Sequence, residues 1–479
     1  MNNTTVNSGH PKGLYILFFT EMWERFSYYG MRALLVLFLT APLFGMEGIE
    51  SPAFAGLGWD RGDALSLYGT YTMLVYLMSI PGGILADKWL GQKKTVMLGG
   101  WLLVAGHGVM AIPQTWAFYT ALALIVLGVG CLKPNISTMV GGLYKDKDPR
   151  RDKGFTIFYI GINLGAFLAP LACGSIAATY GWHWGFGLAG IGMAFGQIVY
   201  MWGQKYLQGV GESLNTDQNL KAANDKPLTN IEKDRVVVLL ISFLIIILFW
   251  AAFEQAGGLM NLYAQEKTNR VIGFLGDINL SFLENGNAIP AAWFQSVNSL
   301  FILTLGLPVA AFWAARSKAG KESSTLLKMA IGTMIMGAGF LFMSKAAIEA
   351  EATTDAKAAM IWLVLAYLFH TVGELCASPT ALSFITKLAP AKYASIMMGV
   401  YFAATGLGNK VAGVIGEVAV SDSTSELTVF TSIAVIWVAL GGLVLLFLKK
   451  LKKLTHGAED GEYTSVNEAA KGEVKEEAM

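Results

Sequence analysis

Long apolar runs recur along the whole chain and are separated by short polar connections. Residues 64–86, 95–132 and 154–204 contain no Asp, Glu, Lys or Arg. A helix needs about 20 apolar residues to cross the ~30 Å hydrocarbon core of a bilayer, so each of the two longer runs holds two crossings. These runs lack the two-residue alternation of a β-barrel strand. The pattern predicts twelve membrane-spanning helices, at residues 14–41, 63–87, 95–112, 116–142, 154–179, 183–206, 235–264, 291–315, 325–345, 358–387, 393–417 and 427–449.

Lysine and arginine are distributed unevenly among the connections between these spans. One set of connections holds the basic clusters around Lys93, Arg150 and Lys449. The opposite set holds only Arg61, Lys267, Arg270, Lys345 and Lys357. Because basic residues accumulate in cytoplasmic loops, we expect both termini on the cytoplasmic side of the cytoplasmic membrane, as an even number of spans requires. The first apolar stretch is expected to remain as an uncleaved span.

A polar stretch in the middle of the chain separates six predicted spans from six. We expect a cytoplasmic tail (1–13), a first six-helix bundle (14–207), a cytoplasmic linker (208–234), a second six-helix bundle (235–454) and a C-terminal tail (455–479). The C-terminal tail is rich in Glu, Gly and Ala and has little to bury, so it is predicted to be disordered.

The composition agrees with a chain embedded in a lipid bilayer. Of the 479 residues, 54% are hydrophobic and 14% are charged, against about 25% charged residues in soluble domains. A soluble enzyme, a coiled coil and a disordered chain are therefore excluded. The net charge of +1 indicates no nucleic-acid partner. The three cysteines lack metal-ligand spacing, and HExxH and GxxxxGK[ST] motifs are absent, so we expect no metal, no cofactor and no enzyme activity.

The first span carries ionisable residues on one face. Glu21, Glu24, Arg25, Tyr28 and Arg32 are spaced by three, one, three and four residues, which places them in a single stripe on an α-helix. An ionised side chain inside a bilayer costs about 2.5–3.5 kcal/mol, so such a stripe must face the protein interior or water. It forms either a functional site or a static ion-pair network; replacing buried pairs by apolar residues is often neutral, which favours a functional site.

Four other spans also carry a charge, at Lys133, Glu254, Glu374 and Lys410. Lys133 lies about ten residues, or ~15 Å, from the next predicted loop, which favours an interior lysine over one that reaches the membrane surface. Either glutamate alone could be protonated and inert, but two of them opposite a cationic first half favour a binding site. The simplest explanation of a charge at Lys410 is an ion pair with Glu417 at the end of the same helix.

Two further patterns point to a carrier built from two bundles. Spans four and ten share a Gly-x5-Pro spacing, at Gly128 and Gly373, as in transporters with internal repeats. The segment Gly83-x3-Asp87-Lys88-x2-Gly91-Gln92-Lys93-Lys94 resembles the loop signature of the major facilitator superfamily. This resemblance implies the all-α major facilitator fold, with Asp87 and Lys88 as a cytoplasmic latch between two six-helix bundles.

Five motifs then resemble one family within that superfamily. Glu21-x-x-Glu24-Arg25-Phe26-x-x-Tyr29-Gly30 resembles the first-span signature of the proton-dependent oligopeptide transporter (POT) family. The other four motifs occur in the family's order, at Leu132-Lys133-Pro134-Asn135, Phe158-Tyr159-x-x-Asn163-x-Gly165, Phe249-Trp250-x3-Glu254-Gln255 and Gly373-Glu374-Leu375-x-x-Ser378-Pro379. The resemblance covers residues from about 10 to 450.

The resemblance implies uptake of di- and tripeptides driven by protons, through alternating access and without a required oligomer. Arg25 and Lys133 would attract the peptide carboxylate, and Glu374 would hold its ammonium group. Lys133 would also be the partner of the first-span glutamates. The residues that would couple proton binding to transport are Glu21, Glu24, Arg25, Arg32 and Glu254. The residues that would contact the peptide are Arg25, Tyr28, Tyr29, Tyr76, Lys133, Asn163, Trp250, Asn298, Glu374, Ser378 and Tyr401.

The chain departs from the family pattern in two places. Many bacterial members have two extra helices between the bundles, but residues 208–234 are too few and too polar to form them. Animal members have a histidine in the second span, whereas residues 63–87 contain none, so coupling is expected to rest on carboxylates.

The competing interpretations are a proton-coupled facilitator for another small solute such as nitrate or an amino acid derivative, a channel or receptor, and a membrane enzyme. Nitrate has no ammonium group to match Glu374, and the first-span glutamates would repel it. No feature of the sequence is typical of a channel, a receptor or an enzyme.

Overall fold

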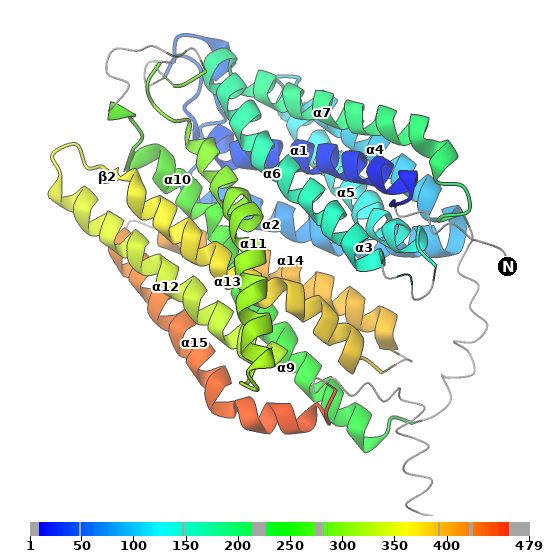
Figure 1. Ribbon diagram of the computed structural model, residues 1–479. Coiled ribbons are helices and arrows are strands. Elements are labelled where there is room, and N and C mark those ends of the chain that lie inside the picture. Colours follow the sequence, from blue (N-terminus) through cyan, green and yellow to red (C-terminus); the bar gives the residue numbers. More distant parts are fainter. Residues whose placement is uncertain are drawn as a thin grey trace, which may run out of the picture.

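The computed structural model describes residues 9–46, 49–145, 148, 150–212, 227–273, 280, 282–284, 286–390, 393–420 and 425–458. Within these residues the chain is almost entirely helical, with twelve long α-helices (Figure 1). The long helices of the first half are α1 (Lys12–Thr40), α2 (Arg61–Leu77), α4 (Gln92–Met110), α5 (Thr115–Gly142), α6 (Arg151–Tyr180) and α7 (Trp182–Trp202). Those of the second half are α9 (Asn230–Phe253), α11 (Gln295–Lys318), α12 (Thr325–Ala352), α13 (Met360–Leu388), α14 (Ala394–Ala419) and α15 (Glu426–Leu454).

Short elements extend or connect these helices. The second span continues from α2 through α3 (Ser79–Leu85) and a helical turn (Ala86–Leu90), and α9 continues through a turn (Glu254–Ala256) into α10 (Leu259–Glu266). Shorter turns lie at Pro52–Phe54, Gly203–Tyr206 and Ala291–Phe294. The strands β1 (Thr268–Asn269) and β2 (Ala358–Ala359) pair in parallel.

The all-helical membrane fold predicted from the hydrophobic pattern is confirmed, because each predicted span coincides with one long helix or continuous helical segment. Among the described residues, nine helices are long and apolar enough to cross a membrane. The helices α1, α4 and α14 are outside that set and carry charged residues such as Arg25, Lys93 and Lys410.

Helix boundaries follow from capping residues. Asp60, Thr229, Ser324 and Ser425 accept hydrogen bonds from backbone N–H groups in the first turns of α2, α9, α12 and α15. Such bonds satisfy donors that have no partner within the helix. The helix α6 ends at Gly181, whose φ of 104° is unfavourable for residues with a side chain.

The two halves of the chain pack as separate groups of helices that meet along two seams. In the first half α1 packs against α6 and α7, and in the second half α12 packs against α13 and α15. The halves meet where α2 contacts α14 and where α6 contacts α11 (Figure 1). At the first seam a Cβ on Gly69 would lie 2.8 Å from the Gly413 Cα, so the two backbones touch. Small residues permit this close approach between helices in membranes.

Glycine packing inside the first half leads to a test with an adjacent control. A Cβ at Gly82 in α3 would overlap the carbonyl oxygen of Gly130 in α5, whereas a Cβ at Gly83 would meet nothing within 4 Å. We expect Gly82→Ala to lower the free energy of unfolding by about 1–3 kcal/mol, because backbone must shift. Gly83→Ala should be neutral or stabilising, because alanine favours helix. Equal melting temperatures for the two variants would contradict this packing.

Parts of the predicted terminal and linker segments lie outside the described residues. These parts are residues 1–8, 213–226 of the linker, and 459–479 of the tail that was predicted to be disordered. Several helices start slightly earlier than predicted, such as α1 at Lys12 and α9 at Asn230, whereas α13 starts two residues later, at Met360.

Candidate functional site

A cavity of about 190 Å³ lies where the two halves of the chain meet. Its lining includes three positive side chains from the first half, Arg25, Arg32 and Lys133, and two carboxylates from the second, Glu254 and Glu374. Other lining residues that the sequence singled out are Tyr29, Tyr76, Asn163, Trp250, Asn298 and Ser378. The structure thus brings most of the sequence-based candidates to one site.

Three ionisable side chains of α1 form a buried cluster beside the cavity. Arg25 Nε donates a hydrogen bond to Glu21 Oε1 at 2.8 Å and lies 3.2 Å from Glu24 Oε2. Glu21 and Glu24 are fully buried, and neither Glu24 oxygen has a hydrogen-bond partner among the described residues. One guanidinium therefore faces two carboxylates. A buried carboxylate without hydrogen bonds is costly even beside a guanidinium, and binding a proton at Glu24 would reduce that cost.

Lys133 reaches the cavity from α5, next to Pro134 in the same helix. Its Nζ lies 3.6 Å from the centroid of the Tyr76 ring in the second span, a cation–π arrangement. The ion pairs found among the described residues do not include one between Lys133 and Glu21 or Glu24. In this conformation the lysine is held by an aromatic ring rather than by the carboxylates predicted to be its partners.

A second buried ion pair connects the two halves. Arg32 Nη2 donates a hydrogen bond to Glu254 Oε2 at 2.8 Å. Tyr68 Oη donates to the same oxygen at 2.8 Å and accepts a hydrogen bond from Arg32 Nε at 2.7 Å. The carboxylate and the guanidinium are both nearly inaccessible to solvent. Because all three groups bond to one another, this pair is well compensated and fastens α1 and α2 to the end of α9.

Glu374 is the carboxylate that faces the cavity from α13. Asn298 Nδ2 in α11 donates hydrogen bonds to Glu374 Oε2 at 2.9 Å and to Thr371 Oγ1 at 3.0 Å. The amide therefore fixes the orientation of the carboxylate. No basic residue among those described pairs with Glu374, which leaves it available for a cationic ligand.

Hydrogen bonds between the halves lie on one side of the molecule. Arg61 Nη1 pairs with Glu266 Oε2 at 2.9 Å, Asn261 Nδ2 donates to the Ala33 carbonyl at 2.9 Å, and Lys410 Nζ donates to Thr70 Oγ1 at 2.8 Å. Two others join the second half to α6, from Trp293 to the Leu171 carbonyl and from Ser296 to the Phe167 carbonyl. All lie toward the C-terminal end of α1 and the N-terminal end of α2. This end of the cavity is closed.

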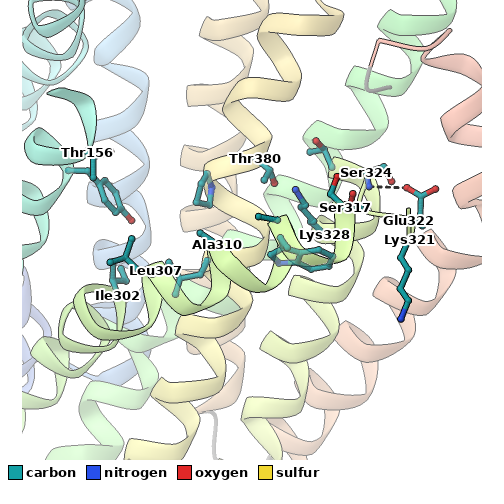
Figure 2. Close-up of a pocket in the computed structure, with 18 of the residues that line it drawn as sticks. Thr156, Ile302, Leu307, Ala310, Ser317, Lys321, Glu322, Ser324, Lys328 and Thr380 are labelled. Carbon is teal, nitrogen blue, oxygen red and sulfur yellow. Dashed lines mark hydrogen bonds between the residues drawn. The ribbon is translucent and has the colours of Figure 1, made fainter. Parts of the chain in front are cut away.

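A larger groove of about 1240 Å³ extends from the cavity toward the opposite side. Tyr159, Asn163 and Ile302 line both spaces, so the groove adjoins the cavity. Figure 2 shows Thr156 and Ile302 toward one end of the groove and Glu322 toward the other. The groove ends near the connection between α11 and α12, on the side where both described chain ends lie. The protein is therefore closed on one side and open on the other.

An ion pair stands at the open end of the groove. Lys452 Nζ lies 3.0 Å from Glu322 Oε2, and the Ser324 backbone N–H donates to Glu322 Oε1 at 2.9 Å. Partial burial alone would raise the pKa of Glu322, but the hydrogen bonds from Lys452 and Ser324 outweigh it and lower that pKa to about 2. Glu322 therefore remains an anion at any physiological pH.

Six residues predicted to act at the site lie outside the cavity lining: Glu21 and Glu24, which stand beside it, and Tyr28, Tyr401, Asp87 and Lys88. Tyr28 is buried in an edge-to-face contact with Tyr29, and Tyr401 lines a smaller adjoining pocket with Trp250 and Ser378. Asp87 and Lys88 are exposed at the end of the second span, and the hydrogen bonds and ion pairs of the described residues do not include either. A latch through this pair is not formed here.

Comparison with known proteins identifies the family of the chain. The sequence model of the POT family matches residues 93–218 and 212–436. The peptide transporter YePEPT of Yersinia enterocolitica is 34% identical, over 94% of this chain and 96% of the relative. A di-/tripeptide transporter of Lactococcus lactis subsp. cremoris is 32% identical, over 93% of this chain and 97% of the relative. The chain belongs to the POT family.

Solved structures of peptide transporters have the same fold as this POT family protein. A crystal structure of a peptide transporter POT in complex with sulfate superposes with a TM-score of 0.82, at 33% identity, over 94% of this chain and 96% of that chain. The major facilitator fold predicted from the loop signature is therefore confirmed. The relatives are transporters, and their names describe peptide transport.

Sequence reasoning missed several residues of the site of this POT family protein. Tyr68 bonds to both members of the Arg32–Glu254 pair, and Tyr159, Gln295 and Tyr367 line the cavity. Tyr159 stands in one of the family motifs, four residues before Asn163, which was a usable signal. Tyr68, Gln295 and Tyr367 carry no charge, so nothing in the sequence marked these positions as unusual for a membrane helix.

The Tyr68 contacts lead to a test with a matched control in the same helix. Tyr68→Phe removes a donor to a buried carboxylate, so we expect a loss of about 1–3 kcal/mol in the free energy of unfolding. Tyr71→Phe is the control, because the Tyr71 hydroxyl is buried without a hydrogen-bond partner among the described residues. Thermal unfolding in detergent measures both variants. A Tyr71→Phe variant as damaged as Tyr68→Phe would contradict the arrangement.

Proposed function

We propose that this POT family protein imports di- and tripeptides together with protons across the cytoplasmic membrane. The proposal rests on one observation: the cavity has Arg25 and Lys133 on the wall from the first half and Glu374 on the wall from the second. A peptide zwitterion carries a carboxylate at one end and an ammonium group at the other. A site with opposite charges on facing walls recognises both ends and thereby selects length.

Peptide side chains would be accommodated with little discrimination. Tyr29, Tyr76 and Trp250 line the cavity, and Tyr401 lines the adjoining pocket. Aromatic surfaces offer contact area without demanding a particular hydrogen bond, so many side chains fit. The Glu374 carboxylate held by Asn298 would bind the ammonium group, while Asn163 lies close enough to the same space to contact the peptide backbone.

Proton coupling would depend on Glu21 and Glu24. When Glu24 binds a proton, its attraction for Arg25 weakens, and the guanidinium, still bonded to Glu21, becomes more available to the peptide carboxylate. A peptide would therefore bind better to the protonated cluster, which couples the two ligands thermodynamically. Glu254 would act as a second proton site, since its protonation weakens the pair with Arg32 that joins the halves.

Alternating access would follow from the one-sided closure of the cavity. With both termini cytoplasmic, the open groove faces the cytoplasm and the bonds around Arg32, Arg61 and Lys410 close the external side. Opening the external side requires these bonds to break while the groove closes. All the proposed ligand contacts come from one chain, so a single copy would suffice.

Uptake into proteoliposomes tests the proposal. The full chain is reconstituted, the external solution is made acidic relative to the interior, and labelled dialanine is added. We expect dialanine to accumulate above its external concentration, a proton ionophore to abolish the accumulation, and unlabelled trialanine to compete. Nitrate should not compete. Accumulation that is insensitive to the ionophore, or that nitrate inhibits, would contradict the proposal.

A further inference from the structure

An apolar groove separate from the central cavity lies on the outer face of the second half. It has a volume of about 370 Å³ and is formed mainly by α9 and α15. Its lining is aliphatic and aromatic, apart from Thr333 at its base and Lys450. The helix α15 lies at the edge of the molecule (Figure 1).

Hydrogen bonds hold the two helices together at each end of the groove. Trp437 Nε1 in α15 donates to the Leu248 carbonyl in α9 at 2.7 Å, and Arg235 Nε in α9 donates to the Thr455 carbonyl at 3.1 Å. Between these two bonds the helices leave a concave surface. The groove is therefore framed by fixed contacts and does not depend on a loose helix.

The part of the groove between Leu440 and Lys450 matches the depth of one leaflet of a bilayer. Along α15 the lining runs from Leu440 to Leu454, and Lys450 stands ten residues, or about 15 Å, from Leu440. Half of the hydrocarbon core of a bilayer is also about 15 Å thick. With Lys450 at the depth of the lipid head groups, on the side of both chain ends, the Leu440 end would lie near the middle of the membrane.

The charge at the mouth of the groove is positive. Lys449, Lys450 and Lys453 stand in the last turns of α15 and are exposed. The nearby carboxylates are already paired, because Asp234 accepts from His456 at 2.7 Å and Glu322 pairs with Lys452 at 3.0 Å. The ion pairs found among the described residues do not include Lys450. A basic side chain above an apolar groove at a membrane surface favours an anionic head group.

We propose that this groove binds an anionic diacyl phospholipid, with one acyl chain between α9 and α15 and the phosphate at Lys450. An extended peptide would find no partners for its backbone hydrogen bonds on walls that are nearly all apolar. A soluble protein could not reach a surface inside the bilayer. The lipid would bridge the first and last helices of the second half and stabilise their contact.

Thermal unfolding of the purified full chain in detergent, with lipid added stepwise, tests this site. We expect dioleoyl phosphatidylglycerol to raise the melting temperature in a saturable manner. Dioleoyl phosphatidylcholine should raise it much less, and glycerol phosphate, which has no acyl chains, should have no effect. Equal effects of the two lipids, or an effect of glycerol phosphate alone, would overturn the proposal.

Two variants and one control locate the binding site. Lys450→Gln should raise the half-saturating concentration of phosphatidylglycerol by about fivefold, the effect of one lysine near an anionic surface. Lys449→Gln removes the same charge from the adjacent exposed residue outside the groove. This variant should change the half-saturating concentration of phosphatidylglycerol less than twofold. Val444→Trp fills the groove and should abolish saturation without changing the melting temperature in detergent alone. Equal effects of the two lysine variants would contradict recognition at Lys450.

Discussion

Glu24→Gln is expected to abolish proton-driven accumulation of peptide while the variant continues to exchange peptide across the membrane. With a pH difference of about one unit, one proton per peptide supports up to about tenfold accumulation. Glutamine cannot bind the coupling proton, so the ratio of internal to external dialanine should fall to about one. Because glutamine resembles a protonated glutamate, Arg25 should remain able to bind peptide. Labelled dialanine uptake with and without an imposed pH gradient measures the first result, and counterflow measures the second.

Glu322→Gln is the matched control for this prediction. Glu322 is a carboxylate that also pairs with a basic residue, Lys452, but it stands at the open end of the groove and not beside the cavity. Its variant should accumulate dialanine like the parent protein. A Glu24→Gln variant that concentrates peptide under a pH gradient would show that coupling lies elsewhere.

Glu374→Gln is expected to weaken peptide binding by tenfold or more. The substitution removes the one negative charge of the cavity that lacks a basic partner among the described residues and that Asn298 orients. A hydrogen bond between charged groups contributes about 1.5–3 kcal/mol, which corresponds to at least a tenfold rise in the KM for dialanine. Transport at saturating peptide should fall less than the affinity does.

A ligand without an ammonium group distinguishes the loss of a direct contact with that group from a general disturbance of the site. N-acetyl-dialanine has no ammonium group, so the parent protein should bind it weakly. The Glu374→Gln variant should bind it no more weakly than the parent does, because the interaction is already absent. If Glu374→Gln weakened the binding of N-acetyl-dialanine as much as it weakens the binding of dialanine, Glu374 would act through the structure of the site and not by direct contact.

The fold was predictable because a bilayer imposes strong rules on the sequence. Uncharged runs marked the helices, and the exceptions to that rule, such as Glu21, Arg25 and Glu374, marked the interior. The stripe on α1 could be placed on one face because helical spacing alone determines it. The residues that line the cavity therefore came largely from charges in unexpected places and from the family motifs.

Contacts between distant helices could not be predicted in the same way. Tyr68 and Glu254 are far apart in the sequence, and nothing local indicates that the Tyr68 hydroxyl donates to Glu254 Oε2. The placement of Lys133 over Tyr76 depends on how α5 and the second span pack. The conformation, closed on one side and open on the other, is a choice between arrangements that the same sequence supports.

The most direct test of the central claim is the pH inside proteoliposomes when peptide is added without an imposed gradient. A dye trapped in the interior should report acidification on addition of dialanine to the parent protein, because each peptide would bring a proton with it. The Glu24→Gln variant, and the parent protein given N-acetyl-dialanine, should produce no signal. Entry of labelled dialanine without any change of internal pH would contradict the account.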